Sequence, residues 1–241
     1  YGLAAEEIPL RADFSMDVDA FCASRGMRVL ANPNAPTGMV LPLSEIERIL
    51  SSDPDRVVLV DEAYVDFGAQ TALPLLAKYE NLLVVRTYSK SRSMAGARLG
   101  FALGSEALIR DLETIRFSTN PYNLNRLTLL LGEAAVADDA YYMENCKKIA
   151  ATRERTAARL KELGFTLAPS QANFLFASHP AVSGETLYSA LKLRGVLVRH
   201  FKKPRISEYV RITIGTPEQM EVLFAAIEDI LKGDTACAPQ R

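Results

Sequence analysis

Two short runs of aliphatic residues, 57–60 and 82–85, constrain the fold of this chain more than any other feature. Runs of this length and composition are typical of strands that are buried on both faces, as in a parallel sheet. Amphipathic stretches of helical period alternate with them, for example at 42–50, where the apolar side chains share one face. Strands that alternate with helices predict an α/β fold with a mostly parallel sheet.

The order of the predicted elements divides the chain into two domains. We expect a large domain over residues 1–137, a smaller α+β domain over 138–232 and a tail over 233–241. The predicted strands are 28–32, 56–60, 81–86, 98–104, 173–176, 196–199 and 210–214. The predicted helices are 42–50, 71–78, 108–117, 123–137, 140–163, 184–193 and 218–231.

The overall composition argues against several kinds of partner. The chain has 241 residues, of which 49% are hydrophobic, so it can bury a large core. Its formal net charge of −1 gives no general attraction to nucleic acid or to an anionic membrane. It contains no apolar run of ~18 residues, the length that indicates a membrane-spanning helix.

The cysteines and histidines do not suggest a disulfide framework or a metal site. Cys22, Cys146 and Cys237 are widely spaced and odd in number, which favours reduced thiols in a cytoplasmic protein. The two histidines, His179 and His200, are too few for a zinc cluster. We therefore expect no metal.

A lysine follows the second aliphatic run in the segment Thr87-Tyr88-Ser89-Lys90. We expect Lys90 at the end of a buried strand, where an amine is costly to place unless it has a role. Lysine amines form Schiff bases with pyridoxal 5'-phosphate (PLP), and Ser89 and Arg98 offer donors for its phosphate. The alternative is that Lys90 is a solvated loop residue and that Ser89 only caps a helix.

A carboxylate and a phenol, Asp61 and Tyr64, follow the first aliphatic run. Ligands of open α/β sheets bind at the carboxyl ends of the strands, so both side chains are candidates for a site there. An acidic residue at the pyridine nitrogen is the usual arrangement for PLP, and a tyrosine can hydrogen-bond the ring oxygen. Alternatively, Asp61 caps the following turn and Tyr64 is a half-buried packing aromatic.

Four motifs together cover most of the chain. They are Asn-Pro-Asn-Ala-Pro-Thr-Gly at 32–38, Asp-Glu-Ala-Tyr at 61–64, Thr-Tyr-Ser-Lys at 87–90 with Arg98, and Tyr-Val-Arg-Ile-Thr-Ile-Gly at 209–215. With them the chain resembles the fold-type-I, PLP-dependent aminotransferases, and most of all the histidinol-phosphate aminotransferases. The resemblance implies a three-layer αβα large domain, a smaller C-terminal α+β domain, PLP as the cofactor and a homodimer with shared active sites.

The resemblance also implies roles for the residues that match the family motifs. The catalytic residues would be Lys90, bonded to PLP, Asp61, at its pyridine nitrogen, and Tyr64, at its ring oxygen. The other cofactor ligands would be Ser89, Arg98, Asn34 and Thr87. The substrate ligands would be Arg211 for an α-carboxylate, Arg199 for a distal phosphate and Asn173 in the pocket wall. As ordinary strand residues, both arginines would instead be edge or salt-bridge residues. Ala35 stands where the family commonly carries Asn, so Tyr64 acts alone at the ring oxygen or Asn34 substitutes.

The implied reaction is transamination of L-histidinol phosphate with 2-oxoglutarate, which gives imidazole acetol phosphate and glutamate in histidine biosynthesis. The alternatives are another aminotransferase, such as one for aromatic amino acids, an enzyme like threonine-phosphate decarboxylase, or a truncated domain without catalysis. The last alternative arises because the chain opens at Tyr1, not Met, and lacks the N-terminal part of the family's usual length. We therefore expect a fragment of a longer protein.

Overall fold

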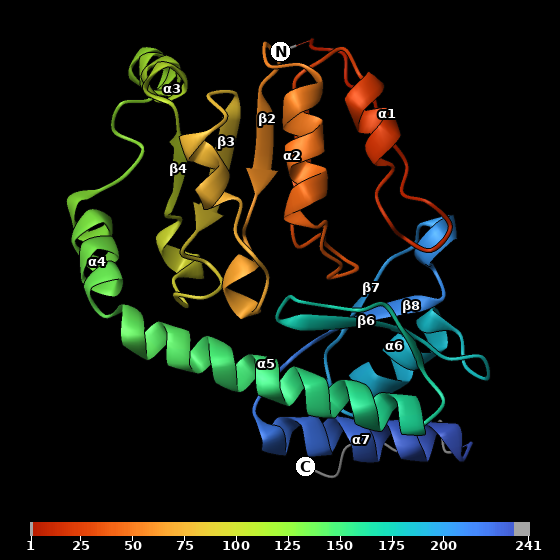
Figure 1. Cartoon of the computed structure of the whole chain (residues 1–241). Helices are drawn as coiled ribbons and strands as arrows, with labels where there is room; N and C mark the ends of the chain where they lie inside the picture. The colour runs from red at the N-terminus through yellow and green to blue at the C-terminus, as the bar shows by residue number, and fades with distance from the viewer. Residues whose placement is uncertain (1, 234–241) are drawn as a thin grey trace.

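The computed structural model describes residues 2–233, which form two four-stranded sheets and the helices around them (Figure 1). The first sheet comes from the N-terminal half of the chain and the second from the C-terminal half. The tail predicted over 233–241 lies outside the described residues except for Gly233. A membrane-spanning helix is not found in the described part of the chain, because its helices are too short or too polar.

The first sheet has three parallel strands and one antiparallel edge strand. In spatial order it contains β1 (Arg28–Ala31), β2 (Val58–Asp61), β3 (Leu82–Thr87) and β4 (Gly100–Gly104). Strands β1, β2 and β3 are parallel, whereas β4 is antiparallel to β3. The predicted α/β fold with a mostly parallel sheet is confirmed. Because parallel strands end at the same edge, the loops that follow β1, β2 and β3 meet there.

Helix α2 (Leu43–Ser52) covers one face of this sheet (Figure 1). Its apolar stripe is fully buried in a core shared with β2 and β3. Each fully buried side chain of this kind contributes about 1.5–3 kcal/mol of hydrophobic stabilisation. The stripe consists of Ile46, Ile49 and Leu50. This layer therefore fixes the strands whose ends carry the candidate site.

The second sheet is antiparallel and has a separate core. In spatial order it contains β5 (Thr166–Leu167), β6 (Phe174–Ser178), β8 (Tyr209–Thr213) and β7 (Arg199–His200). Helices α6 (Gly184–Leu193) and α7 (Pro217–Leu231) pack on one face of it. Alternate residues of a strand point to opposite faces, so Phe174 and Phe176 lie on the face away from these helices. That face contacts the N-terminal half of the chain.

The long helix α5 (Asp139–Glu162) extends from the first sheet to the second (Figure 1). Its buried Arg153 donates to the carbonyl oxygens of Phe67 at 2.9 Å and Ala172 at 2.8 Å. Phe67 follows the first sheet's strand β2 and Ala172 precedes β6, so one guanidinium joins the two halves. The boundary that we predict between residues 137 and 138 falls between α4 (Arg126–Ala137) and α5. The division into domains stays a prediction.

The turn at 32–38 also contacts the second half. Gly38 has a left-handed φ of +76°, and a Cβ atom there would lie 2.1 Å from the hydroxyl oxygen of Ser170. The Gly38 carbonyl accepts the N–H of Gln171 at 2.9 Å. Glycine alone combines this backbone conformation with so close an approach. The motif therefore shapes the edge of the first sheet and holds it against the second half.

Several elements differ from the predictions, among them the two-residue strand β5, which was not predicted. Residues 71–78 form only a short 3₁₀ turn, η2 (Leu73–Ala77), because starting an α-helix is costly for so short a segment. The strand predicted at 196–199 is reduced to β7, which pairs with β8 through two residues. Helix α1 (Val18–Ala23), capped by Asp17, was not predicted, because six residues are too few to show a helical period in the hydrophobic pattern.

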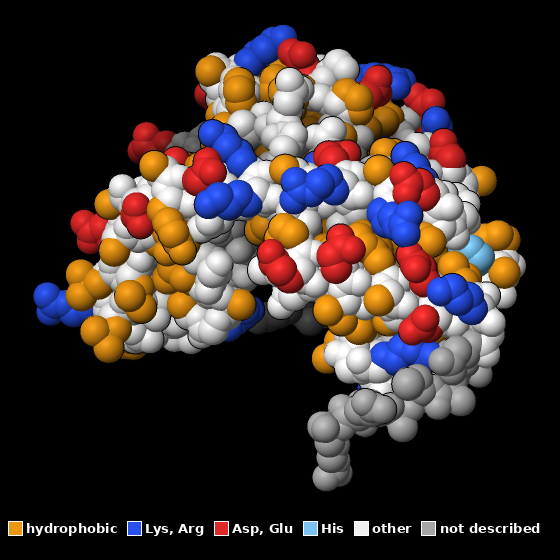
Figure 2. Space-filling view, turned by 90° about the horizontal axis from the view of Figure 1, so that it is seen from below, with side chains coloured by type: hydrophobic (Ala, Val, Ile, Leu, Met, Phe, Trp, Pro, Cys, Tyr) orange, Lys and Arg blue, Asp and Glu red, His pale blue; other side chains and the backbone are white. Residues whose placement is uncertain are grey.

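Helices α3 (Glu106–Thr119) and α4 lie beyond β4, at the edge of the first sheet (Figure 1). Seen from below, acidic and basic side chains are interspersed over the molecule, and hydrophobic side chains gather on the side where α4 lies (Figure 2). Large exposed apolar patches mark interaction surfaces. We call the exposed apolar residues of these two helices the α3–α4 surface: Leu112, Ile115, Phe117, Leu127, Leu129, Leu130, Leu131 and Val136.

Candidate active site

The chain turns sharply where β2 ends, and Asp61 stabilises that turn. One oxygen of its half-buried carboxylate accepts the N–H of Ala63 at 2.9 Å. The second oxygen has no hydrogen-bond partner among residues 2–233. Asp61 therefore caps the turn, as its simpler interpretation predicts, and still has an oxygen available for a ligand.

Behind this turn, a buried ion pair connects β2 to β3. The carboxylate of Glu62 is fully buried and accepts two N–H groups of Arg86, at 3.0 and 2.8 Å. It also accepts the hydroxyl of Thr71 at 2.8 Å and the N–H of Ala72 at 2.5 Å. A buried carboxylate needs several hydrogen-bond donors, because removing its charge from water is costly. The four donors thus hold the end of β2 in place.

The same network extends to the loop that carries Lys90. Asp66 forms an ion pair with Arg86 at 3.6 Å and accepts the hydroxyl of Ser91 at 2.5 Å. Ser91 is buried and immediately follows Lys90. The next residue, Arg92, is held on α5 by an ion pair with Asp139 and by its position 5.2 Å from the ring of Tyr142. The backbone on the C-terminal side of Lys90 is therefore anchored at two places.

Lys90 itself is exposed, so the expectation of a buried amine is wrong. The reason is local: β3 ends at Thr87, and Lys90 lies three residues further on, in a turn. Its ammonium group lies 5.4 Å from the centre of the Tyr64 ring. No carboxylate pairs with Lys90 in the described part of the chain. The structure thus brings two predicted catalytic residues, Lys90 and Tyr64, together.

The predicted phosphate ligands lie in the same loop. The Thr87 hydroxyl donates to the carbonyl of Leu99 at 3.4 Å and accepts the N–H of Ser89 at 3.1 Å. Arg98 has a left-handed φ of 54°, is exposed, and donates to the carbonyl of Ala95 at 3.1 Å. A left-handed conformation is uncommon for a residue other than glycine and is often found at functional sites. Arg98 has no acidic partner among residues 2–233.

Across from this loop, the second sheet presents two arginines side by side. Arg199 of β7 and Arg211 of β8 are directly opposite in the antiparallel register, so both side chains point to one face. The Arg211 guanidinium lies 4.9 Å from the centre of the Phe174 ring, and that ring packs edge-on against Tyr64 at 5.1 Å. The path Lys90–Tyr64–Phe174–Arg211 therefore connects the two halves of the site.

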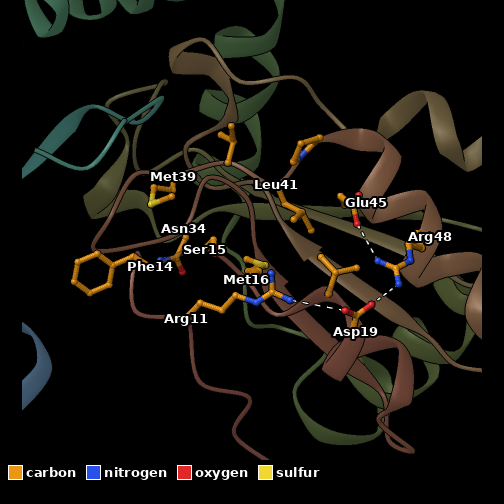
Figure 3. Close-up of a pocket in the computed structure, with 13 residues that line it drawn as sticks. Arg11, Phe14, Ser15, Met16, Asp19, Asn34, Met39, Leu41, Glu45 and Arg48 are labelled. Carbon is orange, nitrogen blue, oxygen red and sulfur yellow. Dashed lines mark hydrogen bonds and ion pairs between the residues drawn. The ribbon is translucent and has the colours of Figure 1, made fainter.

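Asn34 lies apart from that path. Its amide donates to the Thr37 hydroxyl at 2.8 Å, and its side chain lines a cavity of about 330 Å³ between the N-terminal segment and α2 (Figure 3). In the close-up, Arg11 and Arg48 both reach Asp19, so the charges that line this cavity pair with one another. The cavity lining includes none of Lys90, Asp61 and Tyr64.

Asn173 is half-buried and directly precedes Phe174. Its carbonyl accepts the N–H of Ile214 at 2.9 Å, which fixes the backbone next to the end of β8. Asn173 thus lies beside the Phe174–Arg211 contact. In residues 2–233, no group of three or more His, Cys, Asp or Glu side chains is arranged to hold a metal ion.

Sequence reasoning missed three residues that shape this site: Glu62, Arg86 and Phe174. A signal for the first two existed, because Glu62 and Arg86 each lie at the C-terminal end of a buried aliphatic run, and charges that are buried there need partners. Nothing local distinguished Phe174 from an ordinary core residue, because its contacts with Tyr64 and Arg211 span 110 and 37 positions of sequence.

The chain belongs to the class I and II aminotransferase family, whose model matches residues 1–227. It is similar to two curated relatives that are named as histidinol-phosphate aminotransferases. The identity is 51% over 235 residues with that of Marinomonas sp., and 47% over 231 residues with the enzyme numbered 2 of Rhizobium meliloti. These matches cover 95% and 96% of this chain, and the chain spans 66% of the length of both relatives.

Solved structures share the fold at lower sequence identity. The histidinol-phosphate aminotransferase from Sinorhizobium meliloti, in complex with pyridoxal-5'-phosphate, matches with a TM-score of 0.82 and 23% identity, over 94% of this chain and 64% of that one. The L-threonine-O-3-phosphate decarboxylase from Porphyromonas gingivalis matches with a TM-score of 0.77 and 23% identity, over 87% of this chain and 66% of that one. Enzymes that catalyse different reactions therefore share this fold, and the fold alone does not identify the reaction.

Replacing the buried carboxylate tests the role of the Glu62 network. We predict that Glu62→Gln lowers the free energy of unfolding by up to about 3–5 kcal/mol, because it removes the buried carboxylate that accepts from Arg86 and leaves only Asp66, 3.6 Å away, as a counter-charge. Urea unfolding at neutral pH measures this change. The matched control is Glu113→Gln, which removes an exposed carboxylate paired with Arg116 and should have a much smaller effect. Equal effects in the two variants would contradict the assignment.

Proposed function

We propose that this protein is a PLP-dependent aminotransferase that converts L-histidinol phosphate and 2-oxoglutarate into imidazole acetol phosphate and glutamate, a reaction of histidine biosynthesis. One observation carries the proposal: Lys90 and Arg211 approach the same pair of aromatic rings without an acidic partner in residues 2–233. Cations without an acidic partner favour an anionic ligand. The names of the relatives at 45–51% identity support the choice of substrate.

The residues at the end of the first sheet fit PLP. Lys90 has an exposed amine free to bond with an aldehyde, and Asp61 has one carboxylate oxygen free for a pyridinium nitrogen. The hydroxyl of Tyr64 has no hydrogen-bond partner within the described residues, so it is available for the ring oxygen. Ser89, Arg98 and Thr87 are the proposed phosphate ligands. When bound, PLP supplies an electron sink for the substrate's α-carbon.

The chain's own residues would then divide the work of transamination. We propose that the amine of Lys90 moves the proton of the amino donor's Cα, a general acid–base role for which it must be mobile and unpaired. Asp61 would keep its neighbouring nitrogen protonated by pairing with it. Tyr64 would orient the ring through its hydroxyl. Asn34, held by Thr37 on the wall of a separate cavity, is a weaker candidate for this last role.

We propose that Arg211 and Arg199 bind the anionic groups of both substrates. Like charges directly opposite on one sheet face destabilise the sheet unless an anion lies between them. Guanidinium groups bind carboxylates and phosphates through two parallel hydrogen bonds, so the same pair can serve both. Histidinol phosphate has a single anionic group, its phosphate, whereas 2-oxoglutarate has two carboxylates. Asn173 is the proposed neighbour of this anion site.

We also propose a homodimer and a cytoplasmic location. The α3–α4 surface supports the dimer, because a second copy would bury its exposed apolar side chains. The two described cysteines, Cys22 and Cys146, are both free, which supports a reducing compartment. Burial raises the pKa of the Cys146 thiol to about 11, so this thiol stays protonated and unreactive at neutral pH.

The direct test combines the chain with PLP, histidinol phosphate and 2-oxoglutarate and measures glutamate. We predict that glutamate forms and that Lys90→Ala lowers the rate by about 10²–10⁴, the usual contribution of a general acid–base group. Lys148→Ala, which removes an exposed lysine of α5, should leave the rate unchanged. Absence of glutamate with the unaltered chain would favour a domain without catalysis, and an active Lys90→Ala variant would refute the lysine assignment.

A second test concerns the choice of amino donor. We predict that Arg199→Gln lowers kcat/KM for histidinol phosphate about 10- to 100-fold, since a hydrogen bond to a charged group contributes about 1.5–3 kcal/mol. The loss with an unphosphorylated donor such as phenylalanine should be much smaller. Lys202→Gln, which removes an exposed charge three residues away, controls for a general electrostatic effect. Equal losses for both donors would indicate an aminotransferase of different specificity.

A further inference from the structure

Arg211 is held in an unusual way for an arginine that is a candidate ligand of an anionic substrate. It forms no ion pair with any residue of the described chain, and its buried Nε atom has no hydrogen-bond partner. Among residues 2–233, the attractive contact recorded for its charge is with the Phe174 ring, whose centre lies 4.9 Å from the guanidinium carbon. An aromatic ring attracts a cation through its quadrupole. The Phe174 ring therefore lies beside the guanidinium where an arginine commonly has a carboxylate partner.

The difference between a ring and a carboxylate matters for ligand binding. A carboxylate would occupy the N–H groups at the edge of the guanidinium plane, which are the groups that bind an anion. A ring has no acceptor oxygen for those N–H groups, so it leaves them available to a ligand. It also restricts the side chain before the ligand arrives, which reduces the conformational entropy lost on binding.

Phe174 is fixed from the opposite side as well. It is the first residue of β6 and only 2% exposed, and Tyr64 packs against it at an interplanar angle of 87°. Tyr64 belongs to the turn after β2, next to Lys90. The position of the Phe174 ring therefore depends on the first half of the chain, whereas Arg211 belongs to the second.

We infer that Phe174 is a positioning residue, which holds the Arg211 guanidinium through its ring and leaves the N–H groups of that guanidinium available to a carboxylate ligand. Through Tyr64 it also sets the position of that guanidinium relative to the amine of Lys90. The choice of 2-oxoglutarate as the carboxylate ligand rests on the proposed function. The contact between the Phe174 ring and the Arg211 guanidinium is independent of that proposal.

The chain provides a matched control in Phe176. This residue lies on the same strand and the same face, is fully buried, and is directly opposite Arg211 in the register. Its ring, however, stacks on Tyr209 at 4.5 Å and meets Phe14 edge-on at 5.6 Å. Replacing Phe176 disturbs the packing of the strand to a similar extent and leaves the Phe174 ring in place.

The test is calorimetric titration of the 241-residue chain with 2-oxoglutarate in the absence of PLP. We expect Phe174→Leu to raise Kd about 3- to 20-fold, the range that a cation–π contact supports. Phe174→Tyr keeps the ring and should bind within about twofold of the unaltered chain, as should Phe176→Leu, since neither loses that contact. Thermal melting confirms that each variant is folded. Should Phe174→Leu not fold, Phe174→Met replaces it with the same expected loss.

Three results would overturn the inference: unchanged binding in Phe174→Leu, an equal loss in Phe176→Leu, or no binding of 2-oxoglutarate by the unaltered chain. Failure of the proposed function has a different signature. In that case the carboxylate binds and depends on Phe174, while no glutamate forms with PLP and histidinol phosphate. If glutamate forms but Phe174→Leu does not change the Kd for 2-oxoglutarate, the inference about Phe174 fails and the proposed function stands.

Discussion

The buried contact between Glu62 and Arg86 is the constraint on which the rest of the candidate site depends. It joins the ends of two neighbouring parallel strands, and through Asp66 it reaches Ser91 in the Lys90 loop. Because a buried carboxylate requires its donors in defined positions, this network leaves little freedom to the turns after β2 and β3. Asp61 and Tyr64 are half-buried and Lys90 is exposed. The buried network fixes the turns that carry these three residues.

At the candidate site, aromatic rings contact the cationic side chains, whereas in the interior a carboxylate does so. Glu62 neutralises Arg86, whereas Lys90 and Arg211 face the rings of Tyr64 and Phe174. A ring stabilises a cation without consuming its hydrogen-bond donors, so the charge remains available to a ligand. This division separates the cations that maintain the fold from those that can bind substrate.

Much of this arrangement follows from local sequence, and the rest depends on contacts between distant residues. The aliphatic runs before Asp61 and Lys90 predicted parallel strands, and parallel strands bring their carboxyl ends together. The exposure of Lys90 was not predicted, since it depends on where β3 ends and not on the run itself. The contacts of Phe174 and of Arg153 cross between the two halves, and a periodic pattern contains no information about such contacts.

We propose that, among the exposed amines of the chain, that of Lys90 meets the cofactor. Incubation of the chain with PLP, reduction with borohydride and mapping of the modified peptides by mass spectrometry tests it most directly, because reduction makes a Schiff base permanent. We expect the pyridoxyl group on the peptide that contains Lys90. A label distributed over exposed lysines such as Lys148 and Lys202, with Lys90 unmodified, would contradict it.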